Sequence, residues 1–227
     1  MKLSKVRRYR KRHRLIAALF ARNPVLVVGL NLPFLIATSV GLRAAAALSL
    51  ELLLVHLGTM VAALIAARFC PRSVRPVVCV VVSTLLMVAA RLWLISLFRG
   101  IVDSLGMYIY LMAVNGMTLA QTAEVTADSH PAPVLGRAFL NVLAFSVVMF
   151  LFSLFRELAG NGTLWGIAVS VPLRLSGVTV PFFGFILAGF FLAGANVLNK
   201  QLLALALRER ALREARFSVV REQGTRR

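Results

Sequence analysis

The stretch AAAALSLELLLVHLGTMVAALIAA, residues 44–67, carries one carboxylate and one imidazole in an otherwise apolar or small-residue run. A helix needs about 20 such residues to cross roughly 30 Å of hydrocarbon, so this stretch predicts a membrane-spanning helix. Runs at about 77–98, 135–155 and 178–198 have the same character. With 59% hydrophobic and 15% charged residues and a mean hydropathy of +0.84, the 227-residue chain is too apolar for a soluble protein.

Two further apolar runs, 24–38 and 105–120, are short and interrupted, and the second is followed by a predicted polar loop at 121–133. The order short, long, long, short, long, long predicts an all-α polytopic membrane protein with six transmembrane segments in a 3+3 inverted repeat. The two broken half-helices of such a repeat meet near the midplane to build a site. Loose helix packing without a ligand is the alternative explanation of the interruptions. The site candidates are Asn31, Pro33, Asn115 and Gly116.

Basic residues gather at the two ends of the chain, with nine of the 26 Lys and Arg in residues 1–23 and eight in 200–227. This asymmetry predicts that both ends face the cytoplasm beside anionic lipid, and nucleic acid is not an expected partner. We expect a basic interfacial segment over 1–22, a six-segment membrane domain over 23–199, and a basic cytoplasmic helix and tail over 200–227.

The sequence contains no motif of a soluble catalytic site, so the chain is not expected to be catalytic alone. Cys70 and Cys79 have no metal-binding spacing and are expected to be free thiols, and no metal site is predicted. The polar groups inside apolar runs are Glu51, His56 and Arg91, and a charge there must face protein or water. Glu51 could be an ion or proton ligand with Arg91 as its counter-charge, or the two could form a salt bridge. His56 is expected to be a hydrogen-bonded packing residue.

The string RELAGNGTLWG, residues 156–166, resembles a loop of the RnfE, RsxE and NqrD branch of the Rnf and Nqr redox-driven sodium pumps. Its motif residues are Arg156, Glu157, Gly160, Asn161, Gly162 and Thr163. The resemblance covers residues 23–198 and implies a six-helix inverted repeat in a prokaryotic plasma membrane. It also implies pairing with an inverted homologue, RnfA or NqrE, and with other proteins of the complex.

In that family each half-helix brings one cysteine to an iron–sulfur cluster. The corresponding positions are Leu32 or Asn31, and Gly116, and neither is cysteine here. Because such clusters need thiolate sulfur or, rarely, imidazole, we expect this chain to bind no cofactor itself. The iron–sulfur cluster and flavin would belong to partner subunits.

The resemblance therefore implies a membrane subunit of an ion-translocating electron-transport complex, supplying scaffold and part of an ion path. Two alternatives stay open. One is a small-solute transporter or binding component that uses Asn31 and Asn115, and the other is a non-redox structural paralogue.

Overall fold

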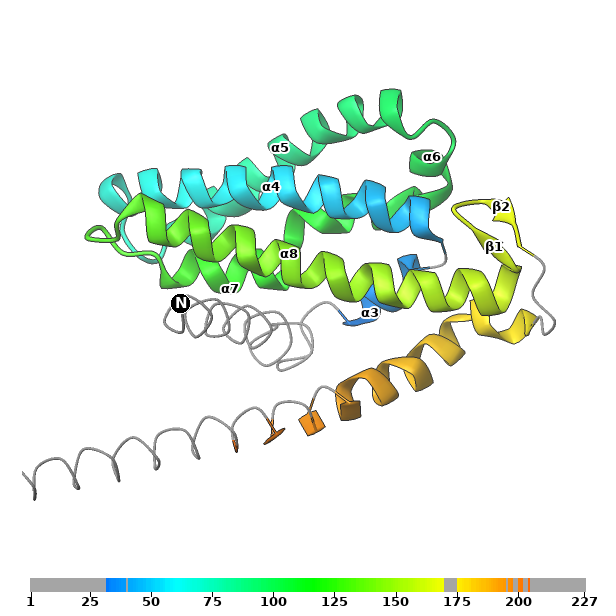
Figure 1. Ribbon diagram of the computed structural model, residues 1–227. Coiled ribbons are helices and arrows are strands. Elements are labelled where there is room, and N and C mark those ends of the chain that lie inside the picture. The colour runs from blue at the N-terminus through cyan, green and yellow to red at the C-terminus, as the bar shows by residue number, and fades with distance from the viewer. Residues whose placement is uncertain are drawn as a thin grey trace, which may run out of the picture.

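The computed structural model describes residues 32–39, 41–169, 175–194, 196–197, 200–201 and 204. Within these, three helices are long and apolar enough to cross a membrane: α4 (Leu42–Phe69), α5 (Arg75–Leu97) and α8 (Pro131–Arg156). A π-helical turn, η4 (Glu157–Asn161), continues α8. Helix α4 packs along both α5 and α8 (Figure 1). These bounds lie within four residues of the predicted runs, because hydropathy marks the part of each helix that lipid must cover.

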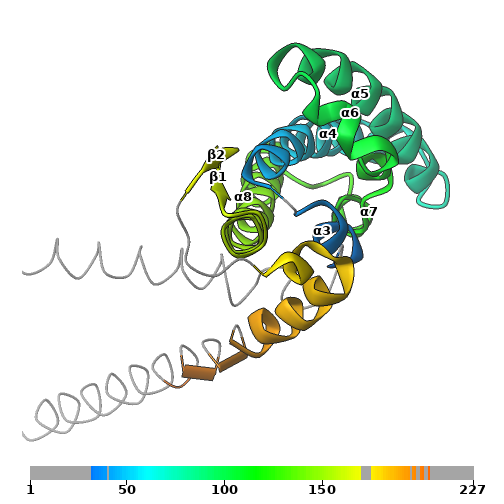
Figure 2. The ribbon, with the colours of Figure 1, turned by 90° about the vertical axis from the view of Figure 1, so that its right-hand side faces the viewer.

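A single apolar core joins the elements of both halves of the chain. Figure 2 looks along the bundle and shows α3 (Leu32–Thr38) close to α8 and to the final helix. That final helix runs over Pro181–Gly194 and follows the short turn η5 (Ser176–Thr179). Buried core side chains come from α3, α4, α5, α8 and the final helix, among them Leu35, Ile36, Leu48, Leu52, Leu94, Phe145, Phe152 and Leu187.

The fourth apolar run forms a chain of short pieces, α6 (Ile101–Leu105), η2 (Gly106–Tyr108), η3 (Tyr110–Val114) and α7 (Gly116–Glu124). The prediction of a loop from residue 121 was wrong, because α7 continues to Glu124. Gln121 and Thr122 are polar but buried on α7, so they belong to the protein interior. The break at Asn115 lies where the sequence predicted it.

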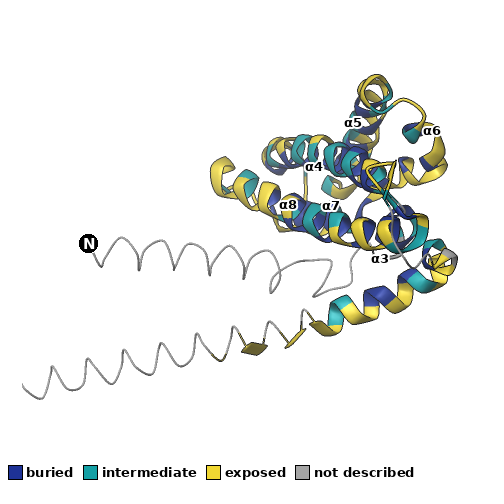
Figure 3. Cartoon of the chain, turned by 45° about the vertical axis from the view of Figure 1, so that its right-hand side comes forward, coloured by how far each residue is buried: buried dark blue, intermediate teal, exposed yellow. Residues whose placement is uncertain are grey.

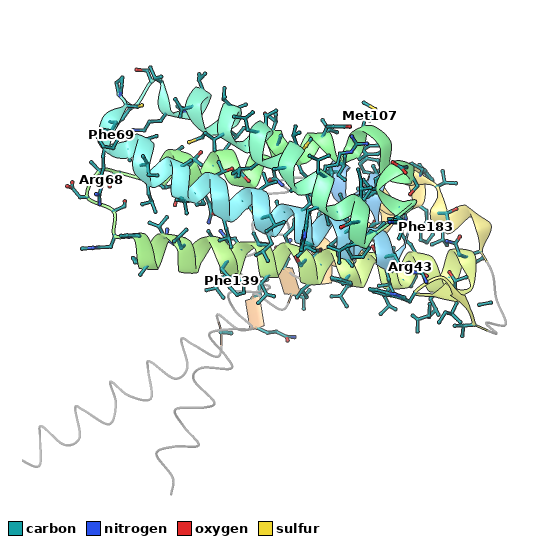
Figure 4. All side chains as sticks on the ribbon, turned by 90° about the horizontal axis from the view of Figure 1, so that it is seen from above. Arg43, Arg68, Phe69, Met107, Phe139 and Phe183 are labelled. Carbon is teal, nitrogen blue, oxygen red and sulfur yellow. The ribbon has the colours of Figure 1, made fainter. Side chains whose placement is uncertain are left out.

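A two-residue hairpin follows η4 at one end of the bundle, which we call the hairpin end. Strands β1 (Thr163–Leu164) and β2 (Ile167–Ala168) pair in antiparallel fashion. The turn residues Trp165 and Gly166 both have positive φ, 57° and 76°, as a type I′ turn requires. Figure 4 shows Arg43 at this end and Arg68 with Phe69 at the opposite end.

Three predictions fall wholly or largely outside the described residues: the segment 1–22, the residue Asn31 and most of the tail 200–227. The sixth predicted run, 178–198, is helical from Pro181 to Gly194 and carries mainly exposed and half-buried side chains (Figure 3). The described part therefore establishes a mostly helical protein with three membrane-capable helices. Six segments in a 3+3 repeat remain a prediction.

Candidate functional site

The break in the fourth segment is organised by Asn115, which is 3% exposed. Its Oδ1 accepts a hydrogen bond from the Met117 N–H at 2.8 Å and so caps α7, while Nδ2 lies 3.6 Å from the sulfur of Met112. The cap satisfies a donor that the first turn of a helix leaves without an intrahelical partner. Gly116 is the first residue of α7 and offers no side-chain ligand.

The first predicted break can be described only in part. Pro33 is the second residue of α3, a position where a missing N–H is harmless. Asn31 lies outside the described residues, and so do the side chains of Leu32 and Pro33. Whether the two asparagines approach each other therefore stays a prediction.

Helix α7 is tied to α4 through a buried imidazole. His56 Nδ1 lies 2.8 Å from Thr118 Oγ1, and His56 Nε2 lies 2.6 Å from Gln121 Oε1. His56 and Thr118 are buried, which is the environment expected of a hydrogen-bonded packing residue. Nearby, the Ser83 hydroxyl of α5 donates to the Ala113 carbonyl at 2.6 Å, where η3 departs from regular α-helix. The broken segment is thus held from both neighbouring long helices.

A pocket of about 300 Å³ lies beside α7, at the end of the bundle opposite the hairpin. Gln121 reaches it, so one partner of His56 also lines this pocket. Its other polar lining includes Glu124 and Arg137, whose side chains form an exposed ion pair at 3.3 Å. The remaining lining residues are Met60, Val125, Ser129, His130, Pro133 and Val134.

Glu51 and Arg91 do not form the salt bridge considered from the sequence. The single ion pair within 4.0 Å in the described part joins Arg137 and Glu124. Glu51 is fully buried, and neither of its carboxylate oxygens has a hydrogen-bond partner there. Arg91 instead lies over the Tyr110 ring, with its guanidinium carbon 5.0 Å from the ring centroid. The cation–π contact accounts for the separation of the two charges.

The loop motif places a buried arginine at the hairpin end. Arg156 Nε donates to the Val178 carbonyl at 3.1 Å, and Nη2 donates to the Thr179 carbonyl. Nη1 donates to the Ile36 carbonyl and, at 3.1 Å, to Ser39 Oγ. Arg156 is 0% exposed and thus joins the end of α3 to the start of the last segment. A guanidinium suits this position because its planar fork reaches several carbonyls at once.

Glu157 makes a second junction beside it. Its Oε2 accepts the Leu42 N–H at 2.6 Å, at the first residue of α4, where Gly41 offers no capping side chain. Its Oε1 accepts the Gly166 N–H at 2.8 Å and the Thr163 hydroxyl at 3.1 Å. One carboxylate therefore caps α4 and holds the hairpin, and a negative charge is favourable at a helix N-terminus.

The rest of the loop motif serves close packing and turning. A Cβ on Gly160 would meet the Thr179 side chain at 2.7 Å, and Gly162 has a φ of 62°. Asn161 ends η4. All six motif residues therefore have positions in one structural junction.

Sequence reasoning missed a matching junction at the opposite end. Arg75, taken from the sequence only as a basic loop residue, donates from Nη2 to the Ala67 carbonyl at 2.8 Å and from Nε to the Cys70 carbonyl at 3.1 Å. Its Nη1 donates to the Val125 carbonyl at 3.1 Å, just past the end of α7. The available signal was its place directly before Pro76, at the start of a predicted span.

The described residues offer little for holding a metal. They contain no group of three or more His, Cys, Asp or Glu side chains close enough to bind a metal ion. Cys70 follows α4 and Cys79 is buried in α5, and both are free thiols. The polar chemistry of the described part is instead hydrogen bonding that shapes broken helices, with one buried carboxylate left over.

Comparison with known proteins identifies relatives across nearly the whole chain. The family model for Rnf-Nqr subunits, which are membrane proteins, matches residues 12–196. An RnfE-type protein of the ion-translocating oxidoreductase complex from Aliivibrio fischeri is 26% identical over 216 residues, covering 88% of this chain and 95% of that protein. The protein of the same name from Shewanella loihica is 28% identical over 201 residues, covering 82% of this chain and 87% of that protein.

Proposed function

Because this chain belongs to the Rnf-Nqr family of membrane subunits, we propose that it is a membrane subunit of an ion-translocating oxidoreductase complex. The observation that carries the proposal is the family match over residues 12–196, which includes every helix described with its bounds above. In this role the chain supplies scaffold and part of an ion path. Electron transfer takes place on the redox groups of its partner subunits, and the chain alone is not catalytic.

We also propose the 3+3 inverted arrangement, and the two arginine junctions support it. Arg75, at the start of the third segment, binds the end of the second segment and the end of the fourth. Arg156, at the end of the fifth segment, binds the start of the sixth and the end of the first. Each junction thus joins the connection between the two long segments of one half to the end of the broken segment of the other half. An inverted repeat would place two such junctions at opposite ends of the bundle.

The cysteine positions of the family do not suit an iron–sulfur cluster in this chain. Gly116 begins α7 without a side chain, the adjacent Asn115 amide caps the helix, and Leu32 is aliphatic. None of these supplies the thiolate or imidazole that iron requires. Any cluster or flavin in the complex is therefore assigned to partner subunits.

The proposed setting is a prokaryotic plasma membrane, with both chain ends and the pocket end facing the cytoplasm. Arg68, Arg72, Arg75 and Arg137 lie at or near that end, as the positive-inside rule favours. Helix α5 exposes large apolar side chains along its length, including Val81, Leu85 and Leu92. Lipid and an inverted homologous subunit of the RnfA or NqrE type would cover such surfaces.

The solute-carrier alternative gains no specific support from the described residues. It requires the Asn115 amide to bind a solute, whereas its oxygen is used to cap α7 at 2.8 Å. The non-redox paralogue differs only in having no effect on turnover.

Copurification tests the proposed function. The full chain, carrying a C-terminal tag, is isolated in mild detergent from its native membrane, and an unrelated tagged membrane protein controls for carry-over. We expect an inverted homologous subunit and flavin- or iron-bearing subunits in stoichiometric amounts. Recovery of a stable lone monomer would refute the proposal, and a mid-membrane cluster signal that depends on this chain would refute its cluster-free role.

A further inference from the structure

Glu51 is a buried carboxylate that the fold leaves without hydrogen bonds. It lies in the first half of α4, is 0% exposed, and both of its oxygens lack a partner among the described residues. An ionised carboxylate in a low-dielectric interior is unstable unless a positive charge or a proton accompanies it. The side chain therefore needs a cationic companion.

Arg91 of α5 is the nearby candidate, but it is not engaged. It acts on the Glu51 carboxylate electrostatically, yet no ion pair within 4.0 Å joins the two. Its guanidinium lies over Tyr110, and its Nε is also buried without a hydrogen-bond partner in the described part. Two opposite charges thus lie on adjacent packed helices with hydrogen-bonding capacity unused on both sides.

Other ionisable groups do not fill this role. Asp103 of α6 is exposed, and His56 is bound to α7. Helix α8 carries its two ionisable residues near its ends, where Arg137 pairs with Glu124 and Arg156 binds carbonyls. Arg91, with Tyr110 beneath it, is consequently the group that governs the charge state of Glu51.

We propose that Glu51 binds a monovalent cation, sodium or a proton, and that Arg91 competes with this cation for the carboxylate. In one state Arg91 lies on Tyr110, as observed, and Glu51 is available to the cation; in the other Arg91 pairs with Glu51 after the cation has left. A single carboxylate balances one positive charge, so a divalent ion would leave an excess charge in the interior. The exchange keeps Glu51 from ever being an unpaired charge within the membrane.

This inference rests on the proposed function, since an ion-translocating complex supplies the cation. The test uses the complex as purified through the tagged chain, in lipid nanodiscs. Thermal stability is titrated with sodium chloride against choline chloride at constant ionic strength, and protonated carboxyl groups are followed by infrared spectroscopy across pH. The first measurement reports sodium and the second reports a proton. The variants are Glu51→Gln and Arg91→Gln, and Glu124→Gln is the matched control at an exposed carboxylate.

We expect one of the two signals in the wild-type complex, its loss in Glu51→Gln and its retention in Glu124→Gln. In Arg91→Gln the competitor is absent, so half-saturation should require at least about tenfold less sodium or a tenfold lower proton concentration. A gain in affinity cannot arise from misfolding, so this variant decides the matter even if Glu51→Gln is unstable. No signal in the wild type, an unchanged signal in Glu51→Gln, or unchanged half-saturation in Arg91→Gln would overturn the proposal. Such a failure in a complex that retains its partner subunits would leave the proposed function intact.

Discussion

Replacing Arg156 with leucine removes the donor that closes the hairpin end of the bundle. The Ile36, Val178 and Thr179 carbonyls and the Ser39 hydroxyl all lose their bond to the guanidinium. Leucine has no polar atom to replace it, and Arg156 is too deeply buried for water to take over without rearrangement. The ends of α3 and η5 should separate as a result.

The structure bounds the size of this effect. Four hydrogen bonds at the membrane-protein average of about 0.6 kcal/mol give a loss of about 2.4 kcal/mol. Three buried carbonyls left without a donor, at about 1–3 kcal/mol each, give about 3–9 kcal/mol. Because the carbonyls can relax partly, we expect about 3–5 kcal/mol, the range found when one partner of a buried charged contact is removed.

Arg137→Leu is a matched control, because it makes the same substitution on the same helix. Its ion pair with Glu124 has side chains 70% and 67% exposed, and exposed pairs contribute about 1 kcal/mol or less. Thermal unfolding of the purified complex, followed by size-exclusion fluorescence, should give a Tm at least about 5 °C lower for Arg156→Leu than for Arg137→Leu. Equal Tm values for the two variants would refute the role assigned to Arg156.

Three further substitutions test other junctions. Glu157→Gln keeps one acceptor but turns an NH₂ group toward a backbone N–H, so unfolding should become easier by about 1–3 kcal/mol in the same thermal assay; an unchanged Tm would contradict the cap on α4. Gly184→Ala places a Cβ 2.5 Å from the Ile36 side chain and should cost about 1–3 kcal/mol, whereas Gly189→Ala enters open space and should be neutral; the reverse order would show that the last helix does not pack as described. Asn115→Ala should cost about 1 kcal/mol and Asn115→Asp much less, because aspartate also caps a helix; equal losses in chemical denaturation would rule out capping as the role of this residue.

Hydropathy predicted the long helices well because lipid imposes a strong and simple requirement on them. The run 44–67 became Leu42–Phe69, and the break at Asn115 was predicted from an Asn-Gly pair inside an apolar run. The end of α7 was misplaced for the same reason that the long helices were found. Gln121 and Thr122 are polar, and hydropathy cannot distinguish a polar side chain that faces His56 from one in a loop.

The roles of individual charges were harder to predict. Arg75 and Arg156 bind backbone carbonyls, and every residue has a carbonyl, so no partner residue type in the sequence points to such a contact. Glu51 and Arg91 were correctly assigned to neighbouring helices, but the position of Tyr110 beneath Arg91 depends on the irregular path of η2 and η3. Only the folded arrangement could show that the two charges are unpaired.

The arginine junctions also bear on how the protein is made. The end of α3 is held by Arg156, which lies 120 residues further along the chain, so the first segment emerges from the ribosome long before its partner exists. The Arg75 junction closes sooner, once Val125 has been synthesised. The first three segments must therefore wait in the bilayer with open carbonyls at one end, protected by lipid headgroups, water or an insertion factor, and a chain truncated before Arg156 should be a substrate for membrane quality-control proteases.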